Sequence, residues 1–366
     1  MCGGVCHTFD MRLSRLLPVS LLVAGLLVAA CSGGSDGGGA STAGDTIAID
    51  TLPSTTEGTV SESTTAVEET TTTAASAPVW PLTGLPLADP ALANRPAVVV
   101  KVGNYDAHPQ RGSLAADIIY EEIINANVSR FAFVYHSQSV AEVGPIRSGR
   151  RQDVDLFGAF NKPVFAWAGG NKTVTAEVES SDLVDLSQFR CQGTCFRTND
   201  DSPSEFTLMF NVDKVFALTF ADAGVPPQQF AYRAADEAAA GTPSAGVNVK
   251  MDSYKIDWTW NATTGLYDRN QNGKTDKDKS GDPLTTNNVV VLAMVYNPGI
   301  SGSPDAVSTG TGEAWVFSGG TMQHGTWTRA DRTQPFTLTD DAGTVMKLTP
   351  GRTFIQLPRQ GDTTPK

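Results

Sequence analysis

Nine polar side chains in the first half of the chain are the strongest candidates for chemistry. Asp117 and Glu121 stand four residues apart, so they lie on one side of the backbone in a helix and in a strand alike. Arg147 and Arg150 follow a Gly-Pro turn, and the planar guanidinium group of arginine binds carboxylate and phosphate through paired hydrogen bonds. The full set is Asn104, His108, Gln110, Asp117, Glu121, Arg130, Arg147, Ser148 and Arg150.

Three interpretations of this set are open. In the first, the arginine-rich turn lines a pocket for an anionic ligand of the cell envelope, such as a phosphorylated polymer or a peptide carboxylate. In the second, Arg130, Arg147 and Arg150 neutralise Asp117 and Glu121 in an internal network. In the third, the two carboxylates are the acid and base of a hydrolase that cleaves glycan or phosphodiester bonds. The surroundings of the two carboxylates discriminate between these interpretations.

A second candidate site is a loop with the opening pattern of a calcium-binding loop. Oxygen-bearing residues occupy its first, third, fifth and ninth positions, and these are Asp268, Asn270, Asn272 and Asp276. Gly273 stands at the sixth position, but the twelfth, which requires a bidentate carboxylate, holds Lys279. Because Asn, Asp and Gly also form ordinary turns, a plain β-loop is the alternative. We expect no cofactor, with calcium as the exception that this loop allows.

Cysteine and histidine usage gives little support for nucleophilic or metal catalysis. Outside the Gly-rich stretch 33–37 the sequence has no Gly-x-Ser-x-Gly pattern, and no two of its four histidines stand at metal-ligand spacing. Cys191 and Cys195 enclose a short Gln-Gly-Thr loop, which predicts a structural disulfide in an oxidising compartment. A metal site and a redox-active pair are the alternatives, although a redox pair usually has two intervening residues. Whether the protein is an enzyme stays open, with a non-catalytic role favoured.

The elements that must position these residues fall into two expected domains. Over residues 80–223, apolar runs predict strands and helical spacing predicts two helices, so we expect an α+β domain. The predicted strands are at 97–102, 131–136 and 164–168, the helices at 151–160 and 171–180, and residues 115–124 fit either element.

The rest of the chain has a different pattern. Residues 224–246 are rich in Pro, Ala and Gly and indicate a connection. Residues 247–360 consist of short alternating runs separated by Gly and Asp/Asn turns, which predicts a mostly antiparallel β domain. The expected fold class is therefore α+β, with a mixed α/β domain followed by a β-rich domain.

The first thirty residues are typical of a lipoprotein signal peptide. Arg12 and Arg15 precede an apolar run over 16–30, which is shorter than the roughly 20 residues that a membrane span requires. The run ends in Val-Ala-Ala directly before Cys31, the pattern in which the cysteine thiol receives a diacylglycerol group. We expect residues 1–30 to be removed, Cys31 to carry the lipid, and the protein to sit on the extracytoplasmic side of the cell membrane.

Composition supports this expected location. Residues 31–79 are rich in Ser, Thr and Gly, with seven carboxylates and no Lys or Arg, which predicts a disordered acidic tether. The whole chain has a formal net charge of -12. Because nucleic-acid binding requires a basic surface, we expect no nucleic-acid partner.

Several strings in both predicted domains resemble one bacterial family. The strings are Pro-Leu-Thr-Gly at 81–84, Ala-Asp-Ile-Ile-Tyr-Glu at 116–121, Gly-Pro-Ile-Arg-Ser-Gly-Arg at 144–150, Gly-Thr-Trp at 325–327 and Pro-Gly-Arg-Thr at 350–353. They resemble the YerB-like lipoproteins, a family defined by two adjoining DUF3048 domains of unknown function. The resemblance implies lipoprotein status and the two-domain plan, and it implies no activity.

These observations favour a lipid-anchored envelope protein that binds an anionic cell-wall or envelope ligand. One alternative is an envelope hydrolase that uses Asp117 and Glu121, and another is an adaptor for a second exported protein. The expected partners are the membrane, through the lipid anchor, and a cell-wall polymer or another exported protein.

Overall fold

The computed structural model describes residues 78–104 and 109–366. The expected signal peptide, the lipidated Cys31, the tether up to residue 77 and His108 lie outside these residues. Within the described ranges, no helix combines the length and apolar character needed to cross a membrane.

The dominant element is an eleven-stranded mixed sheet with the order β20-β19-β18-β15-β22-β2-β3-β1-β4-β5 and with β9 paired to β19. The expected apolar runs at 97–102, 131–136 and 164–168 lie in β1, β3 and β4, and the ambiguous segment 115–124 contains the strand β2. The first half of the chain contributes β1 (Val98–Gly103), β2 (Ile118–Ile124), β3 (Val128–Tyr135), β4 (Val164–Ala166) and β5 (Val184–Asp185).

The second half of the chain contributes the remaining strands of this same sheet. The junction is a parallel pair, β2 with β22, in which Glu121 lies opposite Gln356. Strands from the two expected domains are therefore hydrogen-bonded side by side. The strands from the second half are β9 (Thr242–Pro243), β15 (Asn288–Leu292), β18 (Gly310–Ser318), β19 (Thr321–Arg329), β20 (Thr337–Asp340) and β22 (Thr353–Leu357).

A second, antiparallel sheet covers one face of the large sheet. Its central strands alternate buried and exposed residues, as a sheet with one buried face does. Trp258 is fully buried and meets Phe354 of the large sheet with ring centroids 4.8 Å apart. The strands are β10 (Gly246–Met251), β11 (Tyr254–Asn261), β12 (Leu266–Gln271), β13 (Lys274–Thr275), β14 (Thr285–Thr286) and β23 (Thr363–Pro365).

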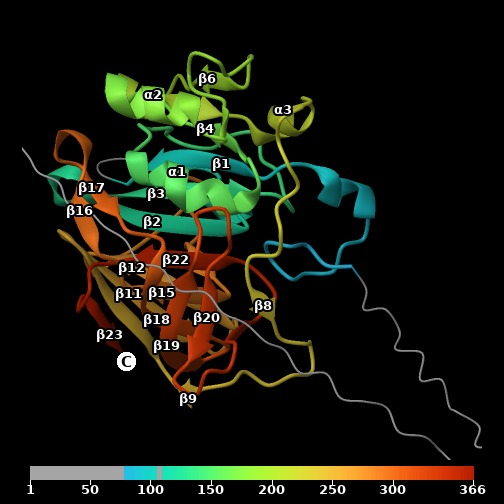
Figure 1. Cartoon of the computed structure of the whole chain (residues 1–366), viewed down its shortest axis with the longest axis vertical. Helices are drawn as coiled ribbons and strands as arrows, with labels where there is room; N and C mark the ends of the chain where they lie inside the picture. Colours follow the sequence, from blue (N-terminus) through green and yellow to red (C-terminus); the bar gives the residue numbers. More distant parts are fainter. Residues whose placement is uncertain (1–77, 105–108) are drawn as a thin grey trace, which may run out of the picture. The chain divides into compact units, whose positions relative to one another are not determined.

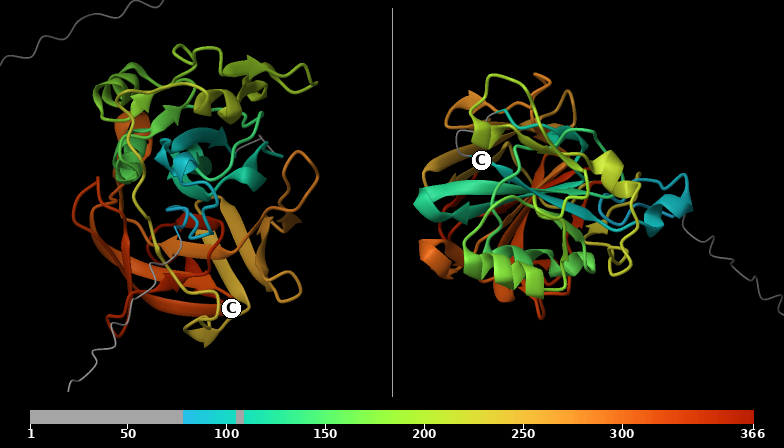
Figure 2. Two further views of the ribbon diagram at one scale, coloured as in Figure 1. Left: turned by 90° about the vertical axis from the view of Figure 1, so that its right-hand side faces the viewer. Right: turned by 90° about the horizontal axis from the view of Figure 1, so that it is seen from above.

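Two helices lie on the opposite face of β1–β3 (Figures 1 and 2). Helix α1 (Arg151–Phe157) places Phe157 against Tyr120 of β2, with ring centroids 5.6 Å apart. Its first turn is capped by Asp153, which accepts the backbone N–H of Arg150 at 2.6 Å. Helix α2 (Lys172–Ser180) follows β4 and is capped by Asn171, whose side chain accepts the N–H of Val174 at 2.9 Å.

Short elements complete the described fold. The expected connection over 224–246 contains β8 and β9, which pair with strands of the second half. The hairpin β16–β17 projects beside α1, as Figure 1 shows in orange. These elements are α3 (Val212–Phe216), β6 (Cys195–Arg197), β7 (Leu208–Phe210), β8 (Ala231–Tyr232), β16 (Tyr296–Pro298), β17 (Pro304–Ala306) and β21 (Lys347–Leu348).

Candidate functional site

Strand β2 carries two adjacent glutamates, and they point to opposite faces of the large sheet. Successive side chains of a strand alternate between its faces, so Glu121 faces the second sheet and Glu122 faces helix α1. Both carboxylates are buried. Each enters a separate ionic cluster, the Glu121 cluster on one face and the Glu122 cluster on the other.

The Glu121 cluster joins the two halves of the chain. Arg269 of β12 donates from Nη2 to Oε2 of Glu121 at 2.8 Å, and its Nη1 pairs with Asp276. Ser129 donates to Oε1 of Glu121 at 2.6 Å, and Gln356 donates to Oε2 at 3.0 Å. Glu121 thus accepts from residues that lie 8, 148 and 235 positions away in the chain. The cluster acts as a clamp between the two sheets.

Arg269 is enclosed by aromatic rings as well as by carboxylates. Its guanidinium carbon lies 5.3 Å from the ring centre of Phe131, 5.4 Å from that of Phe354 and 5.9 Å from that of Trp258. Burial by itself lowers the pKa of Arg269, but the charges of Glu121 and Asp276 outweigh it and raise the pKa. The side chains of Arg269 and Glu121 have no exposed surface. This cluster is closed to solvent and stabilises the fold.

This arrangement differs from the calcium loop that the spacing at 268–276 suggested. The segment is a β-hairpin in which Asn272 and Gly273, both with positive φ, form the turn between β12 and β13. Asp276 is held by Arg269, whereas Asp268 accepts from Asn261 and Asn272 accepts from the backbone of Lys255. The expected ligands, which include Asn270, therefore do not converge on one point.

The Glu122 cluster surrounds a buried lysine on the other face of the sheet. Lys101 of β1 donates from Nζ to Oδ1 of Asp153 at 2.6 Å and also pairs with Glu122. Gln152 of α1 donates to Glu122 at 2.7 Å, and its Oε1 accepts the backbone N–H of Ala306 at 2.9 Å. Burial lowers the pKa of Lys101 to about 8, despite the opposing effect of Asp153.

Three arginines border this cluster and add to its positive charge. Arg130 of β3 donates to the backbone oxygen of Ser148 at 2.9 Å, and Arg150 donates to Oδ1 of Asn125 at 2.8 Å. Burial lowers the pKa of Arg130 and Arg150, and Arg147 adds repulsion to both. The guanidinium of Arg147 lies 5.2 Å from the ring centre of Phe206 and donates to the backbone of Glu205.

These contacts correct the expected internal network. Within the described residues, Arg130, Arg147 and Arg150 make no hydrogen bond or ion pair with Asp117 or Glu121. The three arginines lie on the α1 face of the sheet or beside it, whereas Glu121 lies on the opposite face and is held by Arg269. The physical reason is that successive residues of a strand point to opposite faces of the sheet. The four-residue spacing of Asp117 and Glu121 could not show which face the arginines share.

Asp117 is also buried and satisfied internally. Its Oδ2 accepts the backbone N–H groups of His136 at 2.6 Å and of Ser137 at 2.7 Å, and the hydroxyl of Ser137 donates to Oδ1. Burial raises the pKa of Asp117 to about 6. Asp117 and Glu121 are 1% and 0% exposed. This geometry gives the hydrolase hypothesis no support, because an acid–base pair needs access to substrate and water.

A polar pocket of about 360 Å³ opens beside the arginines. The loop before α1, the start of α2 and the tip of the β16–β17 hairpin form its walls. The Asn171 amide donates to Oγ of Ser301 at 2.7 Å and so connects two of these walls. The lining residues are Asn125, Ser148, Gly149, Arg150, Gly170, Asn171, Val174, Ile300, Ser301 and Ser303.

Only part of the predicted set meets at this pocket. Ser148 and Arg150 line the pocket. Arg130 and Arg147 do not line it, but their positive charges interact with one another and with that of Arg150. Asn104 binds Glu121 and Ser129 in the other cluster, and Gln110 donates to the backbone of Gly103. Sequence reasoning missed the pocket residues Asn125, Asn171, Ser301 and Ser303 and the cluster residues Lys101, Glu122 and Asp153. A lysine in the middle of the apolar run 98–102 was the available signal for this cluster.

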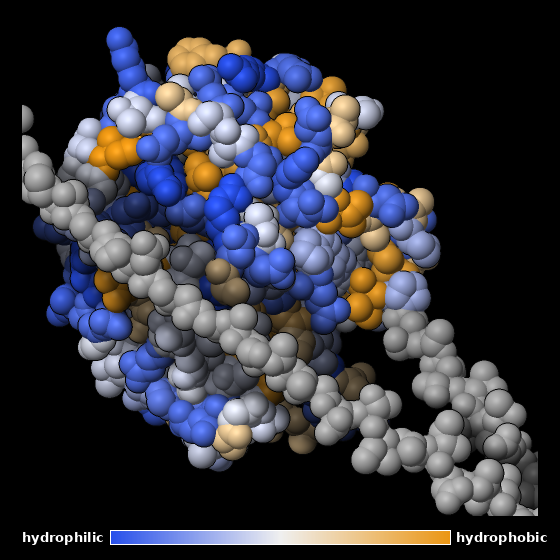
Figure 3. All heavy atoms as spheres, viewed as in Figure 1, coloured by the Kyte–Doolittle hydropathy of each residue, from blue (hydrophilic) through white to orange (hydrophobic). Residues whose placement is uncertain are grey.

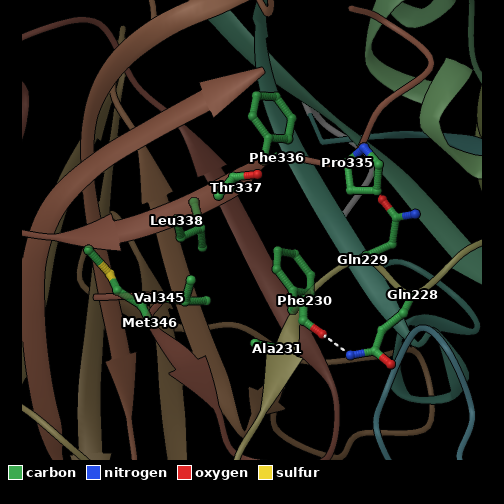
Figure 4. A pocket seen from close by; sticks show the side chains of 10 residues that line it. All are labelled: Gln228, Gln229, Phe230, Ala231, Pro335, Phe336, Thr337, Leu338, Val345 and Met346. Atoms are coloured by element: carbon green, nitrogen blue, oxygen red, sulfur yellow. Dashed lines mark hydrogen bonds between the residues drawn. The ribbon is translucent and has the colours of Figure 1, made fainter. Parts of the chain in front are cut away.

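Two other pockets of the described residues have more apolar walls than the pocket beside Arg150. A groove of about 280 Å³ lies between β8 and β20, and Figure 4 shows Phe230, Phe336 and Leu338 along it. On the face drawn in Figure 3, apolar residues lie in scattered groups among hydrophilic ones. Cys191 and Cys195 are joined by a disulfide with Cα atoms 5.7 Å apart, away from both clusters.

Two family models match the chain. The N-terminal domain of the protein family of unknown function DUF3048 matches residues 82–224, and its C-terminal domain matches residues 247–355. The chain is 23% identical over 294 residues to "Putative lipoprotein YerB" of Bacillus subtilis (strain 168), which covers 76% of this chain and 85% of that protein.

A solved structure has a similar fold. The crystal structure of the YerB protein from Bacillus subtilis superposes with a TM-score of 0.68 and 21% sequence identity, over 79% of this chain and 99% of that one. At this identity the comparison concerns the fold.

Proposed function

The chain belongs to the family with two adjoining DUF3048 domains, and from that premise we propose that it is a lipid-anchored envelope protein that binds an anionic ligand in the pocket beside Arg150. The lipoprotein name of the relative in Bacillus subtilis supports the anchored location. The pocket supports the binding role.

The observation that carries the binding role is an unbalanced charge. Lys101, Arg130, Arg147 and Arg150 act on one another, whereas the carboxylates that act on them from within the site are those of Glu122 and Asp153. Four cations against two carboxylates leave an excess of two positive charges, and the two arginines at the surface of the site, Arg147 and Arg150, are half-buried. Removing an ion from water is costly unless an opposite charge accompanies it. An anionic ligand in the adjacent pocket supplies that charge.

Retention on isolated cell walls tests the binding role. We expect the double variant Arg147→Ala and Arg150→Ala to lose most of its retention while its thermal midpoint stays close to that of the wild type. The matched control is Arg190→Ala, which removes an arginine with 57% exposure and leaves the pocket intact. Undiminished retention of the double variant would refute the proposal. If protease treatment of the walls abolishes retention, the partner is an exported protein and the adaptor role replaces polymer binding.

Acylation of Cys31 is a separate part of the proposal. We expect radiolabelled palmitate to enter the protein in cells, and the labelled protein to enter the detergent phase on phase separation. The Cys31→Ser variant should carry no label and partition into the aqueous phase. A wild-type protein without label that stays in the aqueous phase contradicts the anchor without affecting the pocket.

A further inference from the structure

We propose that the pocket beside Arg150 recognises a phosphomonoester of a sugar or polyol, in preference to a carboxylate or a phosphodiester. This inference rests on the proposed binding function and narrows its ligand class. It follows from the number of charges, the directions of the donors and the polarity of the remaining walls.

The charge count favours a dianion. Among the described residues of this site, the four cations exceed the carboxylates of Glu122 and Asp153 by two charges. A phosphomonoester has a charge of about -1.5 to -2 at neutral pH, whereas a carboxylate has a charge of about -1. A single phosphomonoester therefore neutralises the excess, and a single carboxylate leaves about half of it.

The donors approach the pocket from different elements. Arg150 and Ser148 belong to the loop before α1, and both line the pocket, where Nη2 of Arg150 donates to Oδ1 of Asn125 at 2.8 Å. The N-terminal end of α2 also adjoins the pocket, through Asn171 and Val174. Gly170 precedes this helix and lines the pocket with backbone that no side chain covers. Donors spread in this way suit the three terminal oxygens of a phosphoryl group better than the two coplanar oxygens of a carboxylate.

The remaining walls suit a hydroxylated body. Asn125, Ser301 and Ser303 present amide and hydroxyl groups, which bind hydroxyls as donors and acceptors. Ile300 and Val174 add an apolar patch of the kind that the C–H face of a sugar contacts. The volume of about 360 Å³ lies at the lower end of small-molecule sites and fits a single sugar or polyol unit.

Calorimetric titration of the full-length protein in detergent tests the inference. The probes are glycerol 3-phosphate, inorganic phosphate, glycerate and glycerophosphoglycerol, which differ in the anionic group. We expect glycerol 3-phosphate to bind at least tenfold more tightly than glycerate and glycerophosphoglycerol. Equal affinity for glycerate or for the phosphodiester overturns the inference but leaves anion binding in place. If none of the probes binds, the inference is wrong, and the wall-retention assay decides the proposed function separately.

Two variants separate recognition of the phosphoryl group from recognition of the body. Arg150→Ala should weaken glycerol 3-phosphate and inorganic phosphate alike, with Arg150→Lys as a conservative replacement if the alanine variant does not fold. The double variant Ser301→Ala and Ser303→Ala should weaken glycerol 3-phosphate at least threefold and leave inorganic phosphate unchanged. Arg190→Ala should bind all four probes as the wild type does. Unchanged phosphate affinity in both Arg150 variants overturns the assignment.

Discussion

The Glu121 and Glu122 clusters are built from similar parts and lie on opposite faces of one strand. Each has a glutamate, a buried cation, an aspartate and an amide donor. The Glu121 cluster is sealed between two sheets by aromatic rings. The Glu122 cluster adjoins three more cations and an open pocket. The difference shows that burial of charge alone does not identify a binding site. The excess of positive charge beside an opening is what supports the proposed binding site.

Removal of the central cation should distinguish the clusters most strongly. Arg269→Met leaves Glu121 and Asp276 buried without their cation, so we expect a loss of about 3–5 kcal/mol of unfolding free energy. Lys101→Met should cost less than half as much, because the nearby Arg130 and Arg150 still compensate Glu122 and Asp153. Urea denaturation of both variants measures this. Equal losses would mean that the two clusters do not differ in kind.

The pH dependence of stability should reveal the lowered pKa of Lys101. Between pH 8 and 10.5 the unfolded chain keeps a proton on this lysine that the folded protein has released. The unfolding free energy of the wild type relative to Lys101→Met should therefore rise with pH over this window. The expected rise is about 3 kcal/mol, because each pH unit between the folded and unfolded pKa values contributes about 1.4 kcal/mol. Denaturation curves at pH 7.5 and 10.5 provide the test, and a fall with pH would mean that the folded pKa is raised.

The adjacent glutamates give a matched pair of variants. Glu121→Gln should lower the unfolding free energy by about 2–3 kcal/mol, because it breaks a buried charged network, and it should leave phosphate affinity unchanged. Glu122→Gln should cost about 1–2 kcal/mol and tighten phosphate binding about threefold to tenfold, because it adds to the positive excess. Denaturation and calorimetry on the same preparations check both. Weaker phosphate binding by Glu122→Gln would contradict the charge argument.

The smallest expected effects concern the connection across the pocket. Asn171→Ala removes a helix N-cap and the bond to Ser301, so it should cost about 1 kcal/mol. Ser301→Ala removes only the bond, at an exposed position, and should change stability by less than about 0.5 kcal/mol. The difference in unfolding free energy between the two variants, measured by thermal unfolding, gives the contribution of the cap alone. Equal losses would assign the effect to the bond between Asn171 and Ser301.

Local patterns predicted the strands and the arginine loop well, because apolar runs and Gly-Pro turns act over a few residues. The sequence also placed Arg150 and Ser148 among the candidate residues, and both line the pocket. It could not show that Glu121 meets Arg269, since that contact spans 148 positions and depends on how two sheets pack. Ser301 and Ser303 carried no signal, because their role depends on a hairpin that folds back on α2. The sequence did not single out Glu122, because the four-residue spacing of Asp117 and Glu121 selects residues on the other face of β2.

The parallel pairing of β2 with β22 also constrains the order of events during folding. One edge of residues 118–124 stays bare until residues 353–357 pair with it, so the middle of the main sheet stays exposed until the C-terminal part of the chain has arrived. A bare edge is a template for pairing with other chains. Polypeptides that stop short of residue 353 should therefore self-associate, whereas the finished chain fills that edge with its own C-terminal segment.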